Sequence, residues 1–411
     1  MVNFYCKITI LNQDKRKGLI HVKMKFFLIS AVISMFLITS CAPADKSPDT
    51  SANTSSDTNP PPAAETAEKV KPYTDIRYFS FNNQPSSFEE GQYDSKDIIT
   101  FTFNEGTVLK GSEDVQKQVM ENGKNPGLGI RKLHEEGITG KGINVGIIDQ
   151  NLLLHHPEFE GKIAAYYDTG CEQEENSGSM HAPAVTSLLV GNTIGVAPDA
   201  KGYFAAAPSW TGDSKFYADG LNWIIEENKK LPKNEKIRVV SVSASPSGEG
   251  SPFTKNQDMW DEAVSAAQAE GILVLDCRRD PLTGIIGPAF YDPENPENIE
   301  LCKTGWPSST SHTTLPADLI GVPCSYRTVA EEYTDGSPSY QYTGEGGLSW
   351  SIPYACGVLA LGWQINPEIT NEKMVDWLFE TCYVTEDNSK IINPPAFIAK
   401  IKKLSADVVI H

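Results

Sequence analysis

Asp149, His181 and Ser349 are the residues of this chain whose types and surroundings best suit nucleophilic catalysis. Asp149 ends an apolar run, His181 opens a stretch rich in small residues, and Ser349 stands before a long apolar stretch. A carboxylate, an imidazole and a hydroxyl can together activate a nucleophile for acyl transfer. Each has a commoner structural role when it stands alone, as a turn former, a capping residue and a helix N-cap respectively, so the surrounding sequence must decide.

The local sequence places two of these residues where active sites form. The run Gly142-Ile-Asn-Val-Gly-Ile-Ile before Asp149 is typical of a buried parallel strand, and open α/β sheets build their sites at the carboxyl ends of such strands. Ser349 stands at the expected start of a buried helix, where backbone N–H groups and the helix dipole can stabilise an oxyanion.

Three blocks of sequence around these residues resemble the subtilisin-like serine peptidases. The first is the run that ends at Asp149. The second is Gly178-Ser-Met-His181-Ala-Pro-Ala-Val-Thr-Ser-Leu-Leu-Val-Gly, followed by Gly195-Val-Ala-Pro198, and the third is Gly347-Leu-Ser349-Trp-Ser-Ile-Pro353-Tyr-Ala-Cys-Gly357. The order Asp, His, Ser along the chain is that of subtilisin and differs from the orders in chymotrypsin-like and α/β-hydrolase enzymes.

The resemblance covers the chain from about Pro126 onward and implies an α/β, subtilisin-like three-layer fold with a mainly parallel central sheet in residues 126–411. It also implies a serine endopeptidase, a hydrolase of peptide or protein substrates. In that mechanism Ser349 attacks a peptide carbonyl, neutral His181 removes its proton and Asp149 orients the imidazole. The substrate would be an extended peptide lying beside the strand 239–243.

The segment that should hold an oxyanion donor departs from the family pattern. The family has an Asn shortly after the strand that corresponds to residues 272–275, whereas this chain reads Asp276-Cys-Arg-Arg-Asp280. An ionised Asp280 would repel a developing oxyanion, so the candidate donors are the backbone N–H of Ser349 and the side chains of Arg278 and Arg279. This departure keeps a second interpretation open, a catalytically silent subtilisin-like lipoprotein that binds peptides or a surface partner.

Alternating strand-like and helix-like segments independently predict an α/β domain with a parallel sheet. The expected strands are residues 143–148, 239–243 and 272–275, and the expected helices are residues 182–190, 217–227, 261–270 and 353–363. The stretch 278–316, rich in Pro, Gly and Asp, is expected to form surface loops.

The first 41 residues have the features of an export signal. Lysines precede the apolar run 26–38, which is too short for a comfortable spanning helix, and Ile-Thr-Ser-Cys41 resembles the bacterial lipobox. The resemblance implies that Cys41 carries lipid and anchors the protein on the extracellular face of the bacterial cell membrane. A plain signal peptide with an unrelated cysteine is the alternative. Met24 is a better initiator for this signal than Met1.

Two further segments separate this signal from the domain at 126–411. Residues 42–71 are rich in Pro, Ala, Ser, Thr, Asp and Glu and are expected to form a disordered tether. Residues 72–125 hold a strand-like run, Ile98-Ile-Thr-Phe-Thr-Phe, and a helix-like run at 114–122. They form either an N-terminal extension of the enzyme or a short pro-region.

The charge and the cysteine spacing of the chain argue against some classes of partner and cofactor. A net charge of −18 opposes binding to nucleic acid, which depends on Lys and Arg. The sequence has no Cys-x-x-Cys pair and no EF-hand loop, so no metal or other cofactor is expected in catalysis, and structural calcium, which the family often binds, stays unassigned. Eight cysteines in an exported chain permit disulfides, but their spacing does not decide the pairing.

Overall fold

The computed structural model describes residues 69–78, 86–152, 154–171, 180–281, 283–311, 313–333 and 335–409 of the 411-residue chain. These residues belong to one compact unit, Glu65–His411. The expected export signal with Cys41, and nearly all of the expected tether, lie outside the described residues.

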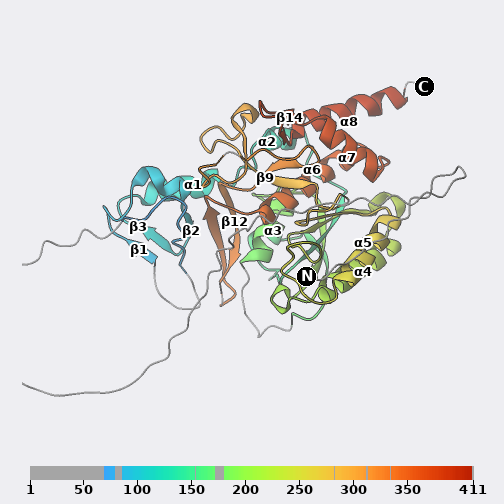
Figure 1. Cartoon of the computed structure of the whole chain (residues 1–411), viewed down its shortest axis with the longest axis horizontal. Coiled ribbons are helices and arrows are strands. Elements are labelled where there is room, and N and C mark those ends of the chain that lie inside the picture. Colours follow the sequence, from blue (N-terminus) through green and yellow to red (C-terminus); the bar gives the residue numbers. More distant parts are fainter. Residues whose placement is uncertain are drawn as a thin grey trace, which may run out of the picture. The chain divides into compact units, whose positions relative to one another are not determined.

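A five-stranded sheet in which all neighbours are parallel forms the centre of this unit (Figure 1). Its order is β5-β6-β4-β7-β8, and its strands are β4 (Asn144–Asp149), β5 (Ile163–Asp168), β6 (Lys201–Ala206), β7 (Ile237–Val242) and β8 (Leu273–Asp276). The three strands β4, β7 and β8 are almost entirely buried, as strands covered on both faces must be. The predicted α/β fold with a mainly parallel sheet is therefore confirmed.

Helices cover both faces of the central sheet and give the unit three layers (Figure 1). These helices are α3 (His181–Val190), α4 (Lys215–Lys230), α5 (Gln257–Ala269) and α6 (Leu348–Ile365). Successive side chains of a strand point to opposite faces, so Val240 packs in the core under α4 and α5 while its neighbour Val239 packs under α3 and α6.

Helix α6 is the innermost helix of its layer. Every residue from Trp350 to Trp363 is buried, which is the pattern of a helix surrounded by protein. Gly357 permits its close approach to the loop after α3, because a Cβ there would lie 2.6 Å from the side chain of Val196. The remaining helices of this region are α2 (Ile130–Glu135), α7 (Asn371–Glu380) and α8 (Pro394–Val409).

A second sheet, of order β10-β9-β11-β15-β14, is built from later parts of the chain. Its strands are β9 (Ile286–Phe290), β10 (Lys303–Thr304), β11 (Ile320–Pro323), β14 (Tyr383–Val384) and β15 (Lys390–Ile391). The prediction that residues 278–316 form surface loops is wrong for β9, which is largely buried and pairs with both β10 and β11. Gly287 and Pro288 hide the strand pattern in the sequence.

The segment before residue 126 adds the last strand of a three-stranded antiparallel sheet, of order β12-β13-β2. Its strands are β2 (Thr102–Asn104), β12 (Arg327–Glu332) and β13 (Pro338–Thr343). In the same segment β1 (Ser86–Phe88) and β3 (Thr107–Leu109) pair in parallel as a separate two-stranded sheet, which α1 (Glu113–Asn122) follows. The strand predicted from residue 98 is wrong up to Thr100, and only its later residues lie in β2. Asp94 caps the 3-10 helix η2 (Ser95–Thr100), and extended backbone begins only after it.

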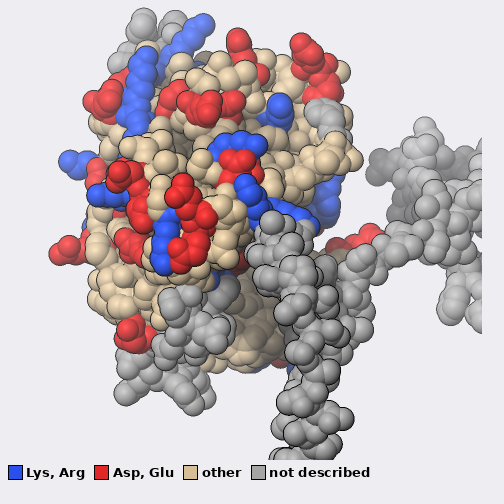
Figure 2. Space-filling view, turned by 90° about the vertical axis from the view of Figure 1, so that its left-hand side faces the viewer, with Lys and Arg blue, Asp and Glu red and all other residues tan. Residues whose placement is uncertain are grey.

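The other short 3-10 helices are η3 (Pro157–Phe159), η4 (Ser209–Thr211), η5 (Lys233–Glu235) and η6 (Ile299–Leu301). No helix within the described ranges is both long and apolar enough to cross a membrane. The six cysteines in these ranges are all free thiols. Acidic and basic side chains are interspersed on the face of the molecule shown in Figure 2.

Candidate active site

Asp149 and His181 are in direct contact. Asp149 is the last residue of β4, at the carboxyl end of the central sheet, and His181 is the first residue of α3. The Nδ1 atom of His181 lies 2.7 Å from Oδ1 of Asp149. The same oxygen accepts a hydrogen bond from the backbone N–H of Gln150 at 2.9 Å, and the carboxylate is only 1% exposed. A buried carboxylate held in this way fixes the orientation of the imidazole.

The charge of Asp149 controls the protonation of His181. Burial of the imidazole lowers its pKa, but the negative charge of Asp149 and the hydrogen bond to it act in the opposite direction and raise the pKa above its ordinary value of 6.5. Because Nδ1 carries the hydrogen that Asp149 accepts, Nε2 is the nitrogen of neutral His181 that can take a proton.

Ser349 is bound to the end of strand β7 through a reciprocal pair of hydrogen bonds. It is the second residue of α6, which begins after the N-cap residue Gly347. Its hydroxyl donates to the backbone oxygen of Ser243 at 3.2 Å, and the hydroxyl of Ser243 donates to the backbone oxygen of Ser349 at 2.8 Å. The pair therefore fixes the start of α6 against the carboxyl end of the central sheet.

Pro353 explains why the backbone oxygen of Ser349 is open to Ser243. A proline has no N–H, so the helical hydrogen bond from residue 353 to the carbonyl of residue 349 cannot form. The hydroxyl of Ser243 supplies the missing donor. The proline of the third sequence block thus has a structural consequence at the nucleophile itself.

Among the contacts of the described residues, the hydroxyl of Ser349 bonds to Ser243 and not to His181. Helices α3 and α6 nevertheless pack against each other, and the ring of Trp350 meets the ring of His181 edge-on with their centroids 5.7 Å apart. Catalytic hydrogen bonds are often long in a free enzyme and tighten when substrate binds.

Arg278, one of the candidate oxyanion donors, has a different role. Its guanidinium lies 2.7 Å from the buried carboxylate of Asp276 and 2.6 Å from the exposed carboxylate of Asp261. It also donates to the hydroxyls of Ser247 and Thr283. All three of its nitrogens are engaged in these contacts, and the residue is 9% exposed. The structure therefore corrects this assignment, because Arg278 is a structural clamp and has no donor directed at Ser349.

The candidate donor Arg279 is likewise occupied elsewhere. Its side chain is about half exposed and pairs with Asp318 at 3.1 Å. Asp280, at the place of the family's Asn, accepts a hydrogen bond from the backbone N–H of Thr283 at 3.3 Å and so closes a local turn. The structure thus brings neither arginine to Ser349, and the remaining candidate is the Ser349 backbone N–H. That group lies in the first turn of α6, where N–H groups have no acceptor within the helix.

Strand β7 has no free edge for a substrate. It lies between β4 and β8 and pairs with both, and the backbone N–H of Cys277 continues the pairing by donating to the oxygen of Ala244 at 2.9 Å. The prediction that a peptide pairs beside residues 239–243 is therefore wrong, because both edges of this strand are already paired.

Cys277 is a neighbour of Ser349 that the sequence argument missed. Its half-buried side chain interacts with the Ser349 side chain. Burial, with the nearby charges of Asp276 and Asp149, raises the pKa of the thiol, so the group is neutral at pH 7. Its position directly after Asp276 at the end of β8 was the available signal, because parallel strands deliver their carboxyl ends to one edge of the sheet.

No group of three or more His, Cys, Asp or Glu side chains in the structurally described ranges could hold a metal ion. The lipid-attachment candidate Cys41 lies outside these ranges.

Comparison with known proteins finds similarity to subtilases in both a family profile and individual sequences. The sequence profile of the Subtilase family matches residues 140–277. Subtilisin NAT of Bacillus subtilis subsp. natto is 23% identical over 258 residues, which are 61% of this chain and 62% of the relative. M-protease of Shouchella clausii is 24% identical over 264 residues, which are 60% of this chain and 61% of the relative. The chain therefore spans less than two thirds of the length of these relatives.

A solved structure described as the structural basis of subtilase cytotoxin SubAB assembly has the same fold. It matches with a TM-score of 0.53 at 14% identity and covers 68% of this chain and 96% of its own. Such a likeness shows the fold alone, and it confirms the subtilisin-like arrangement that the three sequence blocks predict.

Proposed function

The chain belongs to the subtilase family, and from this premise we propose that it is a serine endopeptidase that uses Asp149, His181 and Ser349. One observation carries the proposal, the 2.7 Å contact between Nδ1 of His181 and Oδ1 of Asp149 at the carboxyl end of the central sheet. That contact leaves Nε2 as a base beside the helix that holds Ser349.

The steps of peptide hydrolysis follow from these positions. Nε2 of His181 takes the proton of the Ser349 hydroxyl as the oxygen bonds to the substrate carbonyl carbon. The peptide C–N bond then breaks, and His181 returns the proton to the leaving amine. A water molecule, deprotonated by the same nitrogen, hydrolyses the acyl-enzyme and releases the acid and free Ser349.

The oxyanion of the tetrahedral intermediate is stabilised by the backbone N–H of Ser349 and by the dipole of α6. Both are available because Ser349 lies in the first turn of that helix. Removal of one oxyanion donor from a serine peptidase typically lowers kcat by about 10²–10³. We therefore expect a slow enzyme, because no side-chain amide stands at position 280.

The substrate is an unfolded or extended stretch of peptide or protein. Ser349 is bound to the residue that follows β7, so the scissile bond lies over the carboxyl end of the sheet and the substrate runs across the segment after Ser243. Hydrogen bonds from this segment to the main chain of the substrate would accept many side chains, which suits an enzyme that degrades varied peptides.

Labelling with a fluorophosphonate probe tests the proposal without a known substrate. The wild-type protein should be labelled covalently, and Ser349→Ala and His181→Ala should both lose labelling while remaining folded. Proteolysis of a denatured protein substrate should show the same pattern. An inert but folded wild type would contradict the proposed activity.

A second candidate, a catalytically silent protein that binds peptides, is favoured by one observation. The segment after β8 has Asp280 in place of the family's Asn, so no side-chain amide stands there, and Arg278 is held by Asp276 while Asp280 accepts a hydrogen bond. If that candidate is correct, Ser349→Ala will bind peptides as tightly as wild type and neither protein will be labelled.

We also propose that Cys41 carries lipid and that the protein is held on the extracellular face of the bacterial cell membrane. The support is the run of lysines, apolar residues and Ile-Thr-Ser-Cys41 in the sequence. In cells fed radiolabelled palmitate, the wild type should incorporate label and sediment with membranes, and Cys41→Ala should do neither. Incorporation that survives in Cys41→Ala would exclude this anchor.

A further inference from the structure

Residues 72–125 are joined to the catalytic unit next to the loop that leads to the proposed nucleophile. Strand β2 pairs antiparallel with β13, and in this register Thr102 faces Thr343. Strand β13 ends at Thr343, and α6, which carries Ser349, begins a few residues later. The register therefore places this N-terminal segment directly beside the loop 343–347.

Two hydrogen bonds connect the segment to that loop, and a third bond within the loop continues from them. The backbone oxygen of Phe101 accepts from the N–H of Gly344 at 3.0 Å, and the hydroxyls of Thr102 and Thr343 lie 3.1 Å apart. The Thr343 hydroxyl in turn accepts from the backbone N–H of Gly346 at 2.8 Å. The contact at Gly344 is too close for any side chain, because a Cβ there would lie 2.2 Å from the backbone of the segment.

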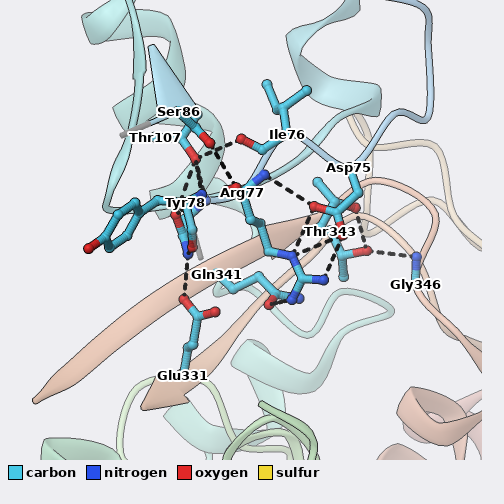
Figure 3. Close-up of polar contacts among 12 residues, drawn as sticks. Asp75, Ile76, Arg77, Tyr78, Ser86, Thr107, Glu331, Gln341, Thr343 and Gly346 are labelled. Atoms are coloured by element: carbon cyan, nitrogen blue, oxygen red, sulfur yellow. Dashed lines mark hydrogen bonds and ion pairs between the residues drawn. The ribbon is translucent and has the colours of Figure 1, made fainter. Parts of the chain in front are cut away.

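Buried polar groups of the β12–β13 hairpin also find their partners in this segment (Figure 3). Asn104 donates to the carboxylate of Glu331 at 2.9 Å, although Glu331 is only 7% exposed. Arg77, which is paired with Asp75 at 2.6 Å, donates to the side chain of Gln341 at 2.5 Å. Burial raises the pKa of Glu331 to about 7, which shows how fully the segment shields this carboxyl from water.

A buried arginine depends on the segment as well. Arg327 is 1% exposed, and among the described residues it forms no ion pair with a carboxylate. Its guanidinium donates to the backbone oxygen of Gly123, just after α1, and to that of Ile194. The backbone N–H of Thr328 donates to the same oxygen of Gly123 at 2.9 Å. The carboxyl end of α1, with its partial negative charge, thus helps to compensate a buried cation.

Loss of residues 72–125 would leave these groups without partners. The edge of β13, the Glu331 carboxyl and the Arg327 guanidinium would each lose hydrogen bonds that the segment now supplies, and unpaired buried polar groups are strongly destabilising. A pro-region that is removed during maturation must leave a self-sufficient enzyme behind. The contacts therefore favour a permanent part of the enzyme over a removable one.

We propose that residues 72–125 stay in the mature, active protein and position Ser349 through the contacts of Phe101 and Thr102 with the loop 343–347. The described residues of the segment have no contact with Asp149, His181 or Ser349, and we propose that the segment acts through this loop. The positioning role rests on the proposed peptidase function, whereas the retention of the segment does not.

Retention is tested by purifying the membrane-associated wild-type protein and determining its intact mass and N-terminal sequence under native conditions. We expect residues 72–125 to remain with residues 126–411. A folded protein that lacks them would overturn the proposal. This measurement does not use activity, so it stands even if fluorophosphonate labelling fails and the peptidase function with it.

Positioning is tested with Thr102→Val, which is isosteric and removes only the hydroxyl. We expect kcat to fall about fivefold, the equivalent of one net hydrogen bond, with little change in KM. Thr102→Ser keeps the hydroxyl and should restore kcat. Val115→Ala changes an exposed residue on α1 of the same segment and is the matched control. Equal kcat in wild type and Thr102→Val, or equal losses in Thr102→Val and Thr102→Ser, would overturn the positioning role.

Discussion

Ser243 and Ser349 hold each other through two hydrogen bonds that run in opposite directions. Each hydroxyl donates to the other residue's backbone oxygen, at 2.8 Å from Ser243 and 3.2 Å from Ser349. One bond replaces the helical bond that Pro353 cannot make, and the other holds the Ser349 hydroxyl away from His181 in the free protein. The pair therefore supports α6 and, in the proposed mechanism, holds the Ser349 hydroxyl in its resting position.

Ser243→Ala should weaken catalysis without removing any group of the proposed triad. The backbone oxygen of Ser349 would lose its donor, and an unsatisfied buried carbonyl typically costs about 1–3 kcal/mol. We expect a lower melting temperature and a fluorophosphonate labelling rate reduced by about tenfold, because the start of α6 would no longer be fixed. Ser265→Ala, at an exposed position of α5 outside this segment, is the control. If both variants label at the wild-type rate, the pair does not position Ser349.

The pH dependence of labelling should report the raised pKa of His181. The base must be neutral, so activity is lost as the pH falls through the pKa that His181 has in the folded protein. Asp149 raises this pKa above 6.5. In Asp149→Asn the burial of the imidazole acts alone and lowers the pKa, so the acid limb should move to lower pH. The remaining rate should fall by about 10⁴, as it does when the carboxylate of a Ser-His-Asp triad is replaced.

The fall of the labelling rate at acid pH is measured for wild type and Asp149→Asn between pH 5 and pH 9 at constant ionic strength. A profile that is flat for wild type would show that His181 is not the base. An unchanged midpoint in Asp149→Asn would show that the carboxylate does not control its protonation.

The sequence predicted the elements whose apolar patterns are long and uniform. The strands expected at 143–148 and 272–275 lie within one residue of β4 and β8, and the helix expected at 182–190 is α3 without His181. These elements are buried on all sides, so their composition alone identifies them. The same uniformity placed Asp149 and His181 at element ends, where the structure brings them together.

The surroundings of the site could not be predicted because they depend on tertiary contacts. Arg278 reads as a surface residue in the sequence, yet the buried carboxylate of Asp276 draws it into the interior. Cys277 lies beside Ser349 only because β8 and α6 meet at one edge of the sheet. The alternation from residue 98 suggested a strand, but the Asp94 cap, a local hydrogen bond, prevails over it up to Thr100.

Arg278→Met should destabilise the protein strongly. It would leave Asp276, whose pKa burial already raises against the influence of Arg278, as an unpaired carboxyl in the interior. Loss of one partner from a buried ion pair typically costs about 3–5 kcal/mol. The double change Asp276→Asn with Arg278→Met should recover much of this loss, which urea unfolding of the wild type and the two variants would measure.

Arg279→Ala is the matched comparison for both stability and catalysis. Its pairing with Asp318 is exposed, so the melting temperature should barely change, and the labelling rate should match wild type. A folded Arg279→Ala that labels at least tenfold more slowly would restore this arginine as an oxyanion donor and contradict the assignment made from its contacts.

Glu331 should make the protein less stable as the pH rises towards neutrality. Its pKa is about 7 in the folded protein and 4.5 ordinarily, so between these values the folded state holds a proton that the unfolded state has lost. Stability is therefore complete below pH 4.5 and decreases as the pH rises through 7, by up to about 3 kcal/mol. The nearby charges of Arg77, Asp75 and Glu105 modify this range.

Glu331→Gln keeps an acceptor for Asn104 and removes the ionisation. The free energy of unfolding of the variant should exceed that of wild type at pH 8, and the difference should shrink at pH 5. A difference that is independent of pH would show that Glu331 does not titrate in this range. Glu262→Gln, at an exposed position of α5 that is not among the charges acting on Glu331, is the control.

Cys277 should make the enzyme sensitive to small thiol reagents. Methyl methanethiosulfonate would attach a methylthio group to a side chain that interacts with Ser349, and the added bulk should block fluorophosphonate labelling. Because burial raises the pKa of this thiol and only the thiolate reacts, inactivation should be slow at pH 7 and faster at higher pH. Cys277→Ala should label normally and resist the reagent. Cys382 is the other half-buried thiol of the described residues, so Cys382→Ala should stay as sensitive as wild type. Equal sensitivity of Cys277→Ala and wild type would place the reactive thiol elsewhere.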